Sequence, residues 1–162
     1  MRATSVHQRR LAAPVGRVGA LIDTLSSADD RLWPHQNWPA MHFDGPLAVG
    51  AAGGHAFIRY RVEEYRPGSS VTFRITGPPG FTGIHRFDAE GDGDESVLTH
   101  TIDGAVTARF APRWFGAVRP LHDALMEDAL DNAERETTGT VAAPAPWSWW
   151  VRALRRLLRP RG

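Results

Sequence analysis

Cysteine and lysine are both missing from this sequence, and each absence excludes a class of chemistry. Without cysteine, the chain has no disulfide scaffold, no thiolate metal site and no cysteine nucleophile. All 19 basic residues are arginine, so mechanisms that form a Schiff base on lysine are excluded as well. Histidine, which occurs seven times, remains available for proton transfer near neutral pH.

Long apolar runs are missing too. Residues 1–10 lack the apolar stretch of a signal peptide, and no run approaches the roughly 20 residues that a bilayer crossing requires. We therefore expect a cytoplasmic protein, with the membrane surface as the alternative. The length of 162 residues suits one domain, and a chain of this size can bury about 70% of its unfolded surface.

The formal net charge is only +1, which argues against a nucleic-acid binder because such proteins carry a strong basic excess. This balance hides a division of charge along the chain. Residues 1–140 contain 14 arginines and 18 acidic residues, a net −4, whereas residues 141–162 contain five arginines and no acidic residue, a net +5. The pattern indicates an acidic body with a basic C-terminal appendage.

Hydrophobic periodicity and turn residues predict the order of elements. A strand over 5–11 precedes a helix that opens at Pro14, and a helical turn follows over 29–33. A turn-rich segment then holds short strands over 41–44 and 47–49. Alternating patterns separated by glycine- and proline-containing turns predict an antiparallel meander over 55–65, 71–76, 81–89 and 95–110.

The apolar period becomes helical over residues 112–137. We expect Pro120 to bend this helix or to mark a break after a preliminary turn, and Gly139 to end it. Four acidic residues lie on the face opposite the apolar stripe, and we expect that face to point away from the core: Asp123, Glu127, Asp131 and Glu134.

The long C-terminal helix has a single apolar face, and a sheet is the element that can bury it. We therefore predict an α+β helix-grip fold, in which a curved antiparallel sheet wraps around the long helix and leaves a cavity between them. Residues 1–139 form this ligand-binding domain, residues 140–146 an Ala/Pro linker and residues 147–162 a basic amphipathic helix.

Three segments resemble a known superfamily. They are GHAFIRYRVEEYRPG at 54–68, GFTGIHRF at 80–87 and RPLHDALMED at 119–128. The sequence from about 3 to 138 is similar to the SRPBCC or START-like proteins, which include polyketide cyclases/dehydrases and lipid-transport proteins. The resemblance implies the helix-grip fold and a small hydrophobic or aromatic ligand, but it does not select one reaction, because the superfamily includes enzymes, receptors and carriers.

Three histidines fall on faces that should line the cavity. Strand alternation places His85 and His100 inward, and His122 lies within the apolar stripe of the long helix. A cyclase or dehydratase would use such imidazoles as acid and base. The alternative is a structural or ligand-orienting role. No His-x-His or HExxH spacing supports a metal, and we expect neither a metal nor a cofactor.

The same alternation provides candidate ligand contacts, most of them aromatic. Trp33, Trp38 and Trp114 either cap the cavity or pack in the core. The full set of candidates is Trp33, Trp38, Phe57, Tyr60, Phe73, Phe81, Phe87, Trp114 and Leu125.

The tail sequence WSWWVRALRRLLRPRG has an apolar face and an arginine face. This pattern is typical of an interfacial helix, with tryptophans for the headgroup region and arginines for anionic lipid. The alternatives are a helix that docks on the acidic body or on a partner, and a disordered basic tail. The candidate membrane-binding residues are Trp147, Trp150, Arg152, Arg155, Arg156 and Arg159.

Three functions follow as hypotheses. The first is a binder or carrier of a small hydrophobic molecule, held at an anionic membrane surface by the tail, with no nucleic-acid partner. The second is a cyclase/dehydratase-like enzyme that uses the cavity histidines. The third is a protein-interaction module with a vestigial cavity.

Overall fold

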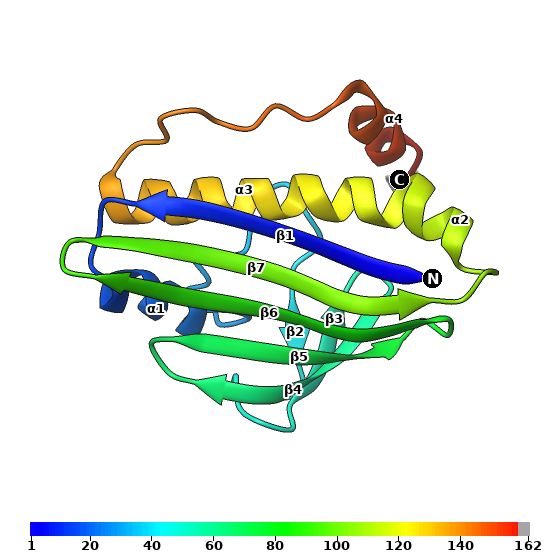
Figure 1. Cartoon of the computed structure of the whole chain (residues 1–162), viewed down its shortest axis with the longest axis horizontal. Coiled ribbons are helices and arrows are strands. Elements are labelled where there is room, and N and C mark those ends of the chain that lie inside the picture. Colours follow the sequence, from blue (N-terminus) through cyan, green and yellow to red (C-terminus); the bar gives the residue numbers. More distant parts are fainter. Residues whose placement is uncertain (159–162) are drawn as a thin grey trace.

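A computed structural model describes residues 1–158 of the chain as one antiparallel sheet with helices on one side (Figure 1). The strand order is β1-β7-β6-β5-β4-β3-β2, so β2 to β7 pair in sequence order and β1 pairs with β7. The seven strands are β1 (Arg2–Leu11), β2 (His42–Phe43), β3 (Ala52–His55), β4 (Ile58–Arg66), β5 (Ser70–Gly77), β6 (Phe81–Asp92) and β7 (Glu95–Val106). The sheet is curved, and the predicted helix-grip class is confirmed.

Five helical segments accompany the sheet. They are α1 (Val15–Asp23), α2 (Ala111–Arg113), the π-helical turn η1 (Trp114–Val118), α3 (Arg119–Thr138) and α4 (Trp149–Leu158). Figure 1 shows α3 running alongside β1 across the sheet. The linker after α3 passes back over α3, so that α4 lies near the first turns of α3. At the other end of the sheet, α1 packs on β5, β6 and β7.

Alternation along the central strands places apolar side chains inward as predicted. In β4, the buried residues Ile58, Tyr60 and Val62 alternate with exposed ones. Pairing of β6 with β7 sets His85 opposite Ile102 and Phe87 opposite His100, so both predicted histidines lie on the inner face.

The predicted strand over 55–65 is wrong at its start, because a tight hairpin turn interrupts it. β3 ends at His55, Ala56 adopts a left-handed backbone with φ of 48°, and β4 begins at Ile58. Alanine rarely adopts this conformation, so the sequence carries no turn signal there. The strand predicted over 47–49 is also absent, since that segment forms turns.

The helix predicted over 112–137 is interrupted by the η1 turn. Pro120 lies in the first turn of α3, so it marks a break after the preliminary turns α2 and η1, which is the second of the two predicted outcomes. Proline has no N–H, so Pro120 cannot donate a hydrogen bond to the carbonyl of Gly116, four residues earlier. The wider π turn η1 is consistent with the loss of this hydrogen bond.

Candidate functional site

A cavity of about 730 Å³ lies between α3 and the inner face of the sheet, with further walls from residues 35–39, the β3–β4 turn and α4. Most of the wall is aromatic or aliphatic. The polar lining consists of four histidines, two arginines and two amides, with no acidic residue among the described lining residues: His35, Gln36, Asn37, His55, His85, Arg113, His122 and Arg155.

Seven of the predicted catalytic and ligand-binding residues line this cavity: Trp38, Phe57, Phe81, His85, Trp114, His122 and Leu125. Phe57 reaches it from the β3–β4 turn rather than from a strand. His85, Trp114 and Leu125 are almost fully buried, whereas Phe57 is exposed. The two kinds of residue therefore mark the floor and the mouth of the cavity.

Five predicted site residues do not line the cavity but pack behind it: Trp33, Tyr60, Phe73, Phe87 and His100. Trp33 donates its Nε1 hydrogen to the carbonyl of Pro39, at 2.9 Å, and packs on the ring of His55. The others are at most 1% exposed. Strand alternation places these residues inward, but neighbouring rings pack against them, with Phe43 on Tyr60 and Phe73 and His100 on Phe87, so inward position alone does not make a ligand contact.

Sequence reasoning missed six of the eight polar residues of the cavity, among them Gln36 and Asn37 from the same loop as His35. His35 and His55 come from segments read as a loop and a strand start, and Arg113 precedes the buried Trp114 in the helical turn. Arg155 was read as a membrane residue of the tail. The sequence signal near these residues is the Gly53-Gly54 pair before His55, since glycines in a strand often mark a site where another backbone comes close. In the structure, a Cβ on Gly53 would lie 1.9 Å from the carbonyl oxygen of His42.

Three neutral histidines lie in the cavity wall or directly behind it: His55 and His85 line the cavity, and His100 packs behind His85. Burial lowers the pKa of His55 to about 3, and burial also lowers the pKa of His85 and His100 well below the usual value. His100 Nε2 lies 3.5 Å from His85 Nδ1, and the Tyr60 hydroxyl lies 3.1 Å from His55 Nδ1. Among residues 1–158, three buried nitrogens lack a hydrogen-bond partner: His85 Nε2, His100 Nδ1 and Trp114 Nε1.

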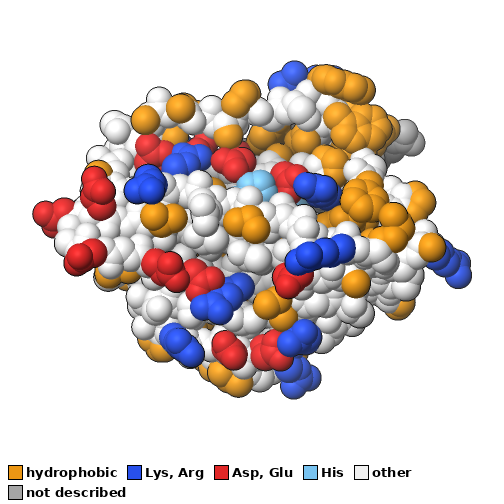
Figure 2. Space-filling view, in the orientation of Figure 1, with side chains coloured by type: hydrophobic (Ala, Val, Ile, Leu, Met, Phe, Trp, Pro, Cys, Tyr) orange, Lys and Arg blue, Asp and Glu red, His pale blue; other side chains and the backbone are white. Residues whose placement is uncertain are grey.

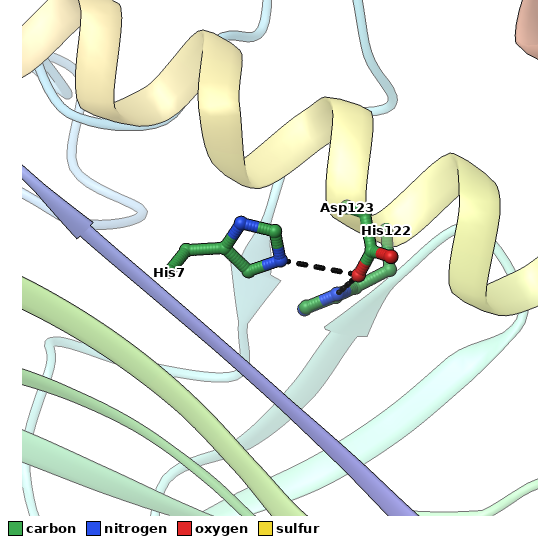
Figure 3. A group of neighbouring side chains, drawn as sticks. All are labelled: His7, His122 and Asp123. Atoms are coloured by element: carbon green, nitrogen blue, oxygen red, sulfur yellow. Dashed lines mark hydrogen bonds and ion pairs between the residues drawn. The ribbon is translucent and has the colours of Figure 1, made fainter.

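Asp123 connects the cavity to the edge strand β1 (Figure 3). Its Oδ1 accepts a hydrogen bond from Ser5 Oγ at 2.8 Å and lies 3.1 Å from His7 Nε2 and 3.5 Å from His122 Nδ1. Burial alone would raise the pKa of Asp123, but the hydrogen bonds from His122, His7 and Ser5 lower it well below its usual range. The group is therefore an anion that orients three donors.

This geometry assigns a tautomer to His122. Burial lowers its pKa despite the opposing hydrogen bond to Asp123, so the ring is neutral. Because an ionised carboxylate can only accept, Nδ1 carries the proton. Nε2 is then the basic nitrogen of a ring that lines the cavity. An imidazole held in this way can take a proton from a bound molecule.

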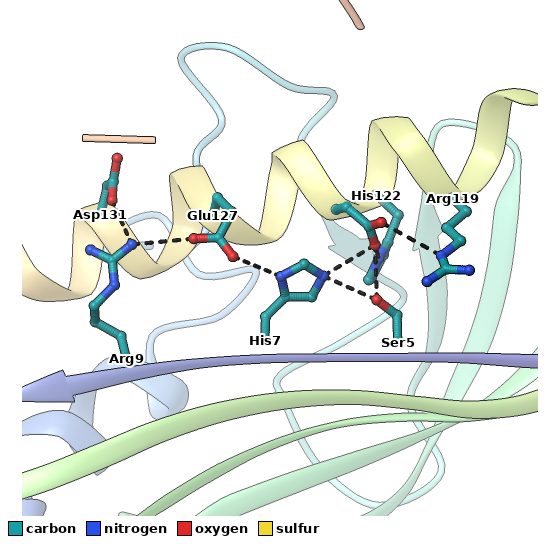
Figure 4. A network of polar contacts seen from close by, with 8 residues as sticks. Ser5, His7, Arg9, Arg119, His122, Glu127 and Asp131 are labelled. Carbon is teal, nitrogen blue, oxygen red and sulfur yellow. Dashed lines mark hydrogen bonds and ion pairs between the residues drawn. The ribbon is translucent and has the colours of Figure 1, made fainter. Parts of the chain in front are cut away.

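The acidic face of α3 does not point to solvent as expected. Figure 4 shows Ser5, His7 and Arg9 projecting from β1 toward it. Glu127 lies 2.7 Å from His7 Nδ1, and Arg9 pairs with Glu127, Asp131 and Glu134. The face was misread because the position of β1 beside α3 depends on its long-range pairing with β7.

Three of these groups also form a possible metal-binding set. One ligand atom each of His7, His122 and Asp123 lies within 4.8 Å of the others. The carboxylate already accepts from Ser5 and pairs with His7 and Arg119, whose Nε lies 3.6 Å away. Hydrogen bonds and ion pairs account for the cluster, so we assign no metal to it.

The tail helix docks on the body. Trp147 donates its Nε1 hydrogen to Asp128, which also accepts from Trp38 Nε1 at 2.7 Å. The guanidinium of Arg155 stacks over the rings of both tryptophans, at 4.3 Å from Trp38 and 4.2 Å from Trp147. Val151 and Leu154 are buried on the same side.

The other face of the tail helix is open. Trp149 is 72% exposed and Leu157 is 78% exposed, and Figure 2 shows apolar side chains gathered over α4 and the adjoining helix. Arg152 and Arg156 are exposed as well, and Arg159 lies outside the described residues. No helix within residues 1–158 is long and apolar enough to cross a membrane.

Comparison with known proteins identifies the fold. Neither a protein-family model nor a curated protein matches the sequence. Among solved structures, norcoclaurine synthase from Thalictrum flavum matches with a TM-score of 0.63 at 13% identity, over 83% of this chain and 86% of that one. A point mutant of the same enzyme, solved in complex with a transition-state analogue, matches with a TM-score of 0.58 at 15% identity, over 80% of this chain and 92% of that one.

The protein has the helix-grip fold. CalU16 from Micromonospora echinospora matches this chain with a TM-score of 0.59 at 12% identity, over 97% of this chain and 91% of that one. A match of that extent leaves too few residues uncovered to omit the whole of α4, so at least part of α4 falls within the matched span.

Proposed function

We propose that this protein binds a small apolar molecule in the cavity between α3 and the sheet. The observation that carries the proposal is a volume of about 730 Å³ with mainly apolar walls and two unpartnered buried nitrogens, His85 Nε2 and Trp114 Nε1. Ligand sites commonly measure roughly 300–1,000 Å³ and combine apolar walls with a few polar groups. A ligand oxygen can accept a hydrogen bond from Trp114 Nε1, and a ligand hydroxyl can pair with His85 Nε2 in either tautomer.

Nile red, an uncharged apolar dye, tests this proposal. We expect its fluorescence to rise on binding to the purified protein and to be lost in Leu121→Trp, which fills the cavity from a half-buried position. Leu157→Trp adds the same ring on the exposed face of α4 and serves as the control. Equal binding by both variants would contradict the cavity as the site. Absence of any ligand in native mass spectra, together with no dye binding, would favour the interaction module.

We further propose that the open face of α4 meets an anionic membrane surface. Arg155 and Leu158 belong to both the cavity wall and the tail helix, so ligand entry and membrane contact would occur at the same place. The exposed Trp149 and Leu157 are suited to the interface, and each arginine near an anionic surface contributes about 1 kcal/mol.

Vesicle sedimentation tests the membrane proposal. We expect the protein to bind vesicles of phosphatidylcholine with phosphatidylserine more strongly than pure phosphatidylcholine. The double variant Trp149→Ser/Leu157→Ser should lose this binding, whereas Val6→Ser, an exposed apolar residue of β1, should retain it. Equal sedimentation of the two variants would refute a membrane role of α4.

A second candidate function is an acid–base enzyme of the cyclase/dehydratase kind. The observation that favours it is His122, whose Nδ1 faces Asp123 and whose Nε2 remains basic. If a polyketone is turned over, His122→Gln should lower kcat by roughly 10²–10⁴-fold. Asp123→Asn should lower kcat less and alter its pH profile, because Asp123 acts through His122. Unchanged turnover in both variants would leave the binder as the remaining function.

A further inference from the structure

The charge of the cavity wall differs from that of the rest of the body. Residues 1–140 carry a net −4, yet the described lining holds two arginines and no acidic side chain. Arg113 comes from α2 and Arg155 from α4, so two separate segments bring positive charge to one cavity. An acidic protein that excludes carboxylates from one cavity and places two arginines there has a site complementary to an anion.

Both arginines are held against aromatic rings. The guanidinium of Arg113 lies 4.3 Å from the centre of the Phe57 ring, and that of Arg155 is stacked on Trp38 and Trp147. Stacking fixes the plane of a guanidinium, and its N–H groups then point sideways in the geometry that binds a carboxylate. Among the described residues, no acidic side chain forms an ion pair with Arg113, although the protein uses other arginines in such pairs.

The positive charge is confined to the mouth. Arg113 is exposed and Arg155 is half-buried, whereas His85, on the floor, is 6% exposed. Burial lowers the pKa of His55, His85 and His122, so these imidazoles are neutral and add no charge to the interior. An apolar body would therefore occupy the floor, and an anionic group would remain near the mouth.

We propose that the molecule bound in this cavity is an apolar acid, with its carboxylate held by Arg113 and Arg155 at the mouth. This inference rests on the proposed function, since it requires that the cavity binds a ligand. It goes beyond that function because it defines the charge of the ligand. It also gives α4 a direct part in binding, through Arg155.

A matched pair of fluorescent probes separates the two proposals. We would titrate the protein with an anthracene carboxylic acid and with the corresponding anthracene methanol, which has nearly the same shape but no charge. The acid should bind about tenfold more tightly at neutral pH, and added salt should weaken the acid alone. Equal affinities would overturn the inference and leave the cavity proposal standing. Failure of both probes, with no Nile red binding, would overturn both.

Variants then identify the groups responsible. Arg113→Gln and Arg155→Gln should each lower affinity for the acid several-fold and leave affinity for the alcohol unchanged, and Arg155→Lys should retain most of the preference. Arg109→Gln and Arg156→Gln are matched controls, because both arginines are exposed and neither lines the cavity. An equal loss for acid and alcohol would show that the arginines only support the wall, and would overturn the inference.

Discussion

The indole Nε1 of Trp150 donates a hydrogen bond to the carbonyl oxygen of Gly116, at 2.8 Å. In an uninterrupted α-helix that carbonyl would accept from the residue four positions later, but this residue is Pro120 and has no N–H. The tail helix therefore supplies a donor in place of the missing α-helical one. The irregular turn η1 and the docking of α4 are two parts of one arrangement.

Removing this donor should loosen the tail. We expect Trp150→Phe to cost about 1 kcal/mol, because it keeps an aromatic side chain but removes the indole N–H that the Gly116 carbonyl accepts, and to lower Tm by about 2–4 °C. Trp149→Phe is the control, since Trp149 is 72% exposed. Thermal unfolding followed by circular dichroism measures both variants. A Trp150→Phe protein that melts like Trp149→Phe would show that the bond contributes nothing to docking.

The hydrogen bonds of Asp128 are a second contact that holds the tail on the body. Asp128 accepts hydrogen bonds from the indoles of both Trp38 and Trp147, and an asparagine there has only one accepting oxygen. In Asp128→Asn we expect trypsin, which cuts after arginine, to cleave the tail several-fold faster, as measured by mass spectrometry of the released fragment. Asp94→Asn, in the exposed β6–β7 turn, should be cleaved at the wild-type rate. Equal rates for the two variants would rule out Asp128 as the anchor.

Much of the fold was predictable because its signals are local. The alternation of Ile58, Tyr60 and Val62 gives the inner face of β4, and the helical period after Pro112 gives α3. The hairpin at Ala56 was not predictable, since its left-handed conformation is strained for alanine and depends on the pairing of β3 with β4.

The candidate site was less predictable because it depends on contacts between distant segments. Inward alternation applies equally to Phe81 and Phe87, yet only Phe81 lines the cavity, since the ring of His100 packs on Phe87 and α1 covers that part of β6. The role of His7 could not be predicted, because its partners Asp123 and Glu127 lie more than 100 residues later in the chain. Arg155 belongs to an amphipathic pattern that a membrane helix and a docked helix share, so the pattern alone does not place Arg155 in the cavity wall.

The buried histidines predict a loss of stability in acid. The folded protein holds His55, His85, His100 and His122 neutral with pKa values lowered by burial, whereas the unfolded chain takes up protons below about pH 6.5. The unfolded state then binds more protons, so stability falls as pH decreases from about 6.5 toward the lowered folded values, which reach about 3 for His55. The slope is up to about 1.4 kcal/mol per pH unit for each histidine.

Urea unfolding measures this slope. Between about pH 6.5 and pH 5, His100→Leu should unfold with a shallower pH dependence than the wild type, by about one proton, because one of the four neutral histidines is gone. His42→Gln removes an exposed histidine and should leave the slope unchanged. A His100→Leu slope equal to that of the wild type would mean that His100 is not held neutral in the folded state.

His7 should show the opposite pH dependence. Burial alone would lower its pKa, but hydrogen bonds and charge attraction from Asp123 and Glu127 outweigh it and raise the pKa above 6.5. A raised folded pKa contributes stability that is complete below the unfolded value and is lost as pH rises through the folded value. The free energy of unfolding lost in His7→Gln should therefore be largest at about pH 6 and should shrink by about pH 9. His42→Gln is again the control. A loss that stays constant across this range would show that His7 stabilises the β1–α3 contact by packing and neutral hydrogen bonds, without the charge that we assign to it.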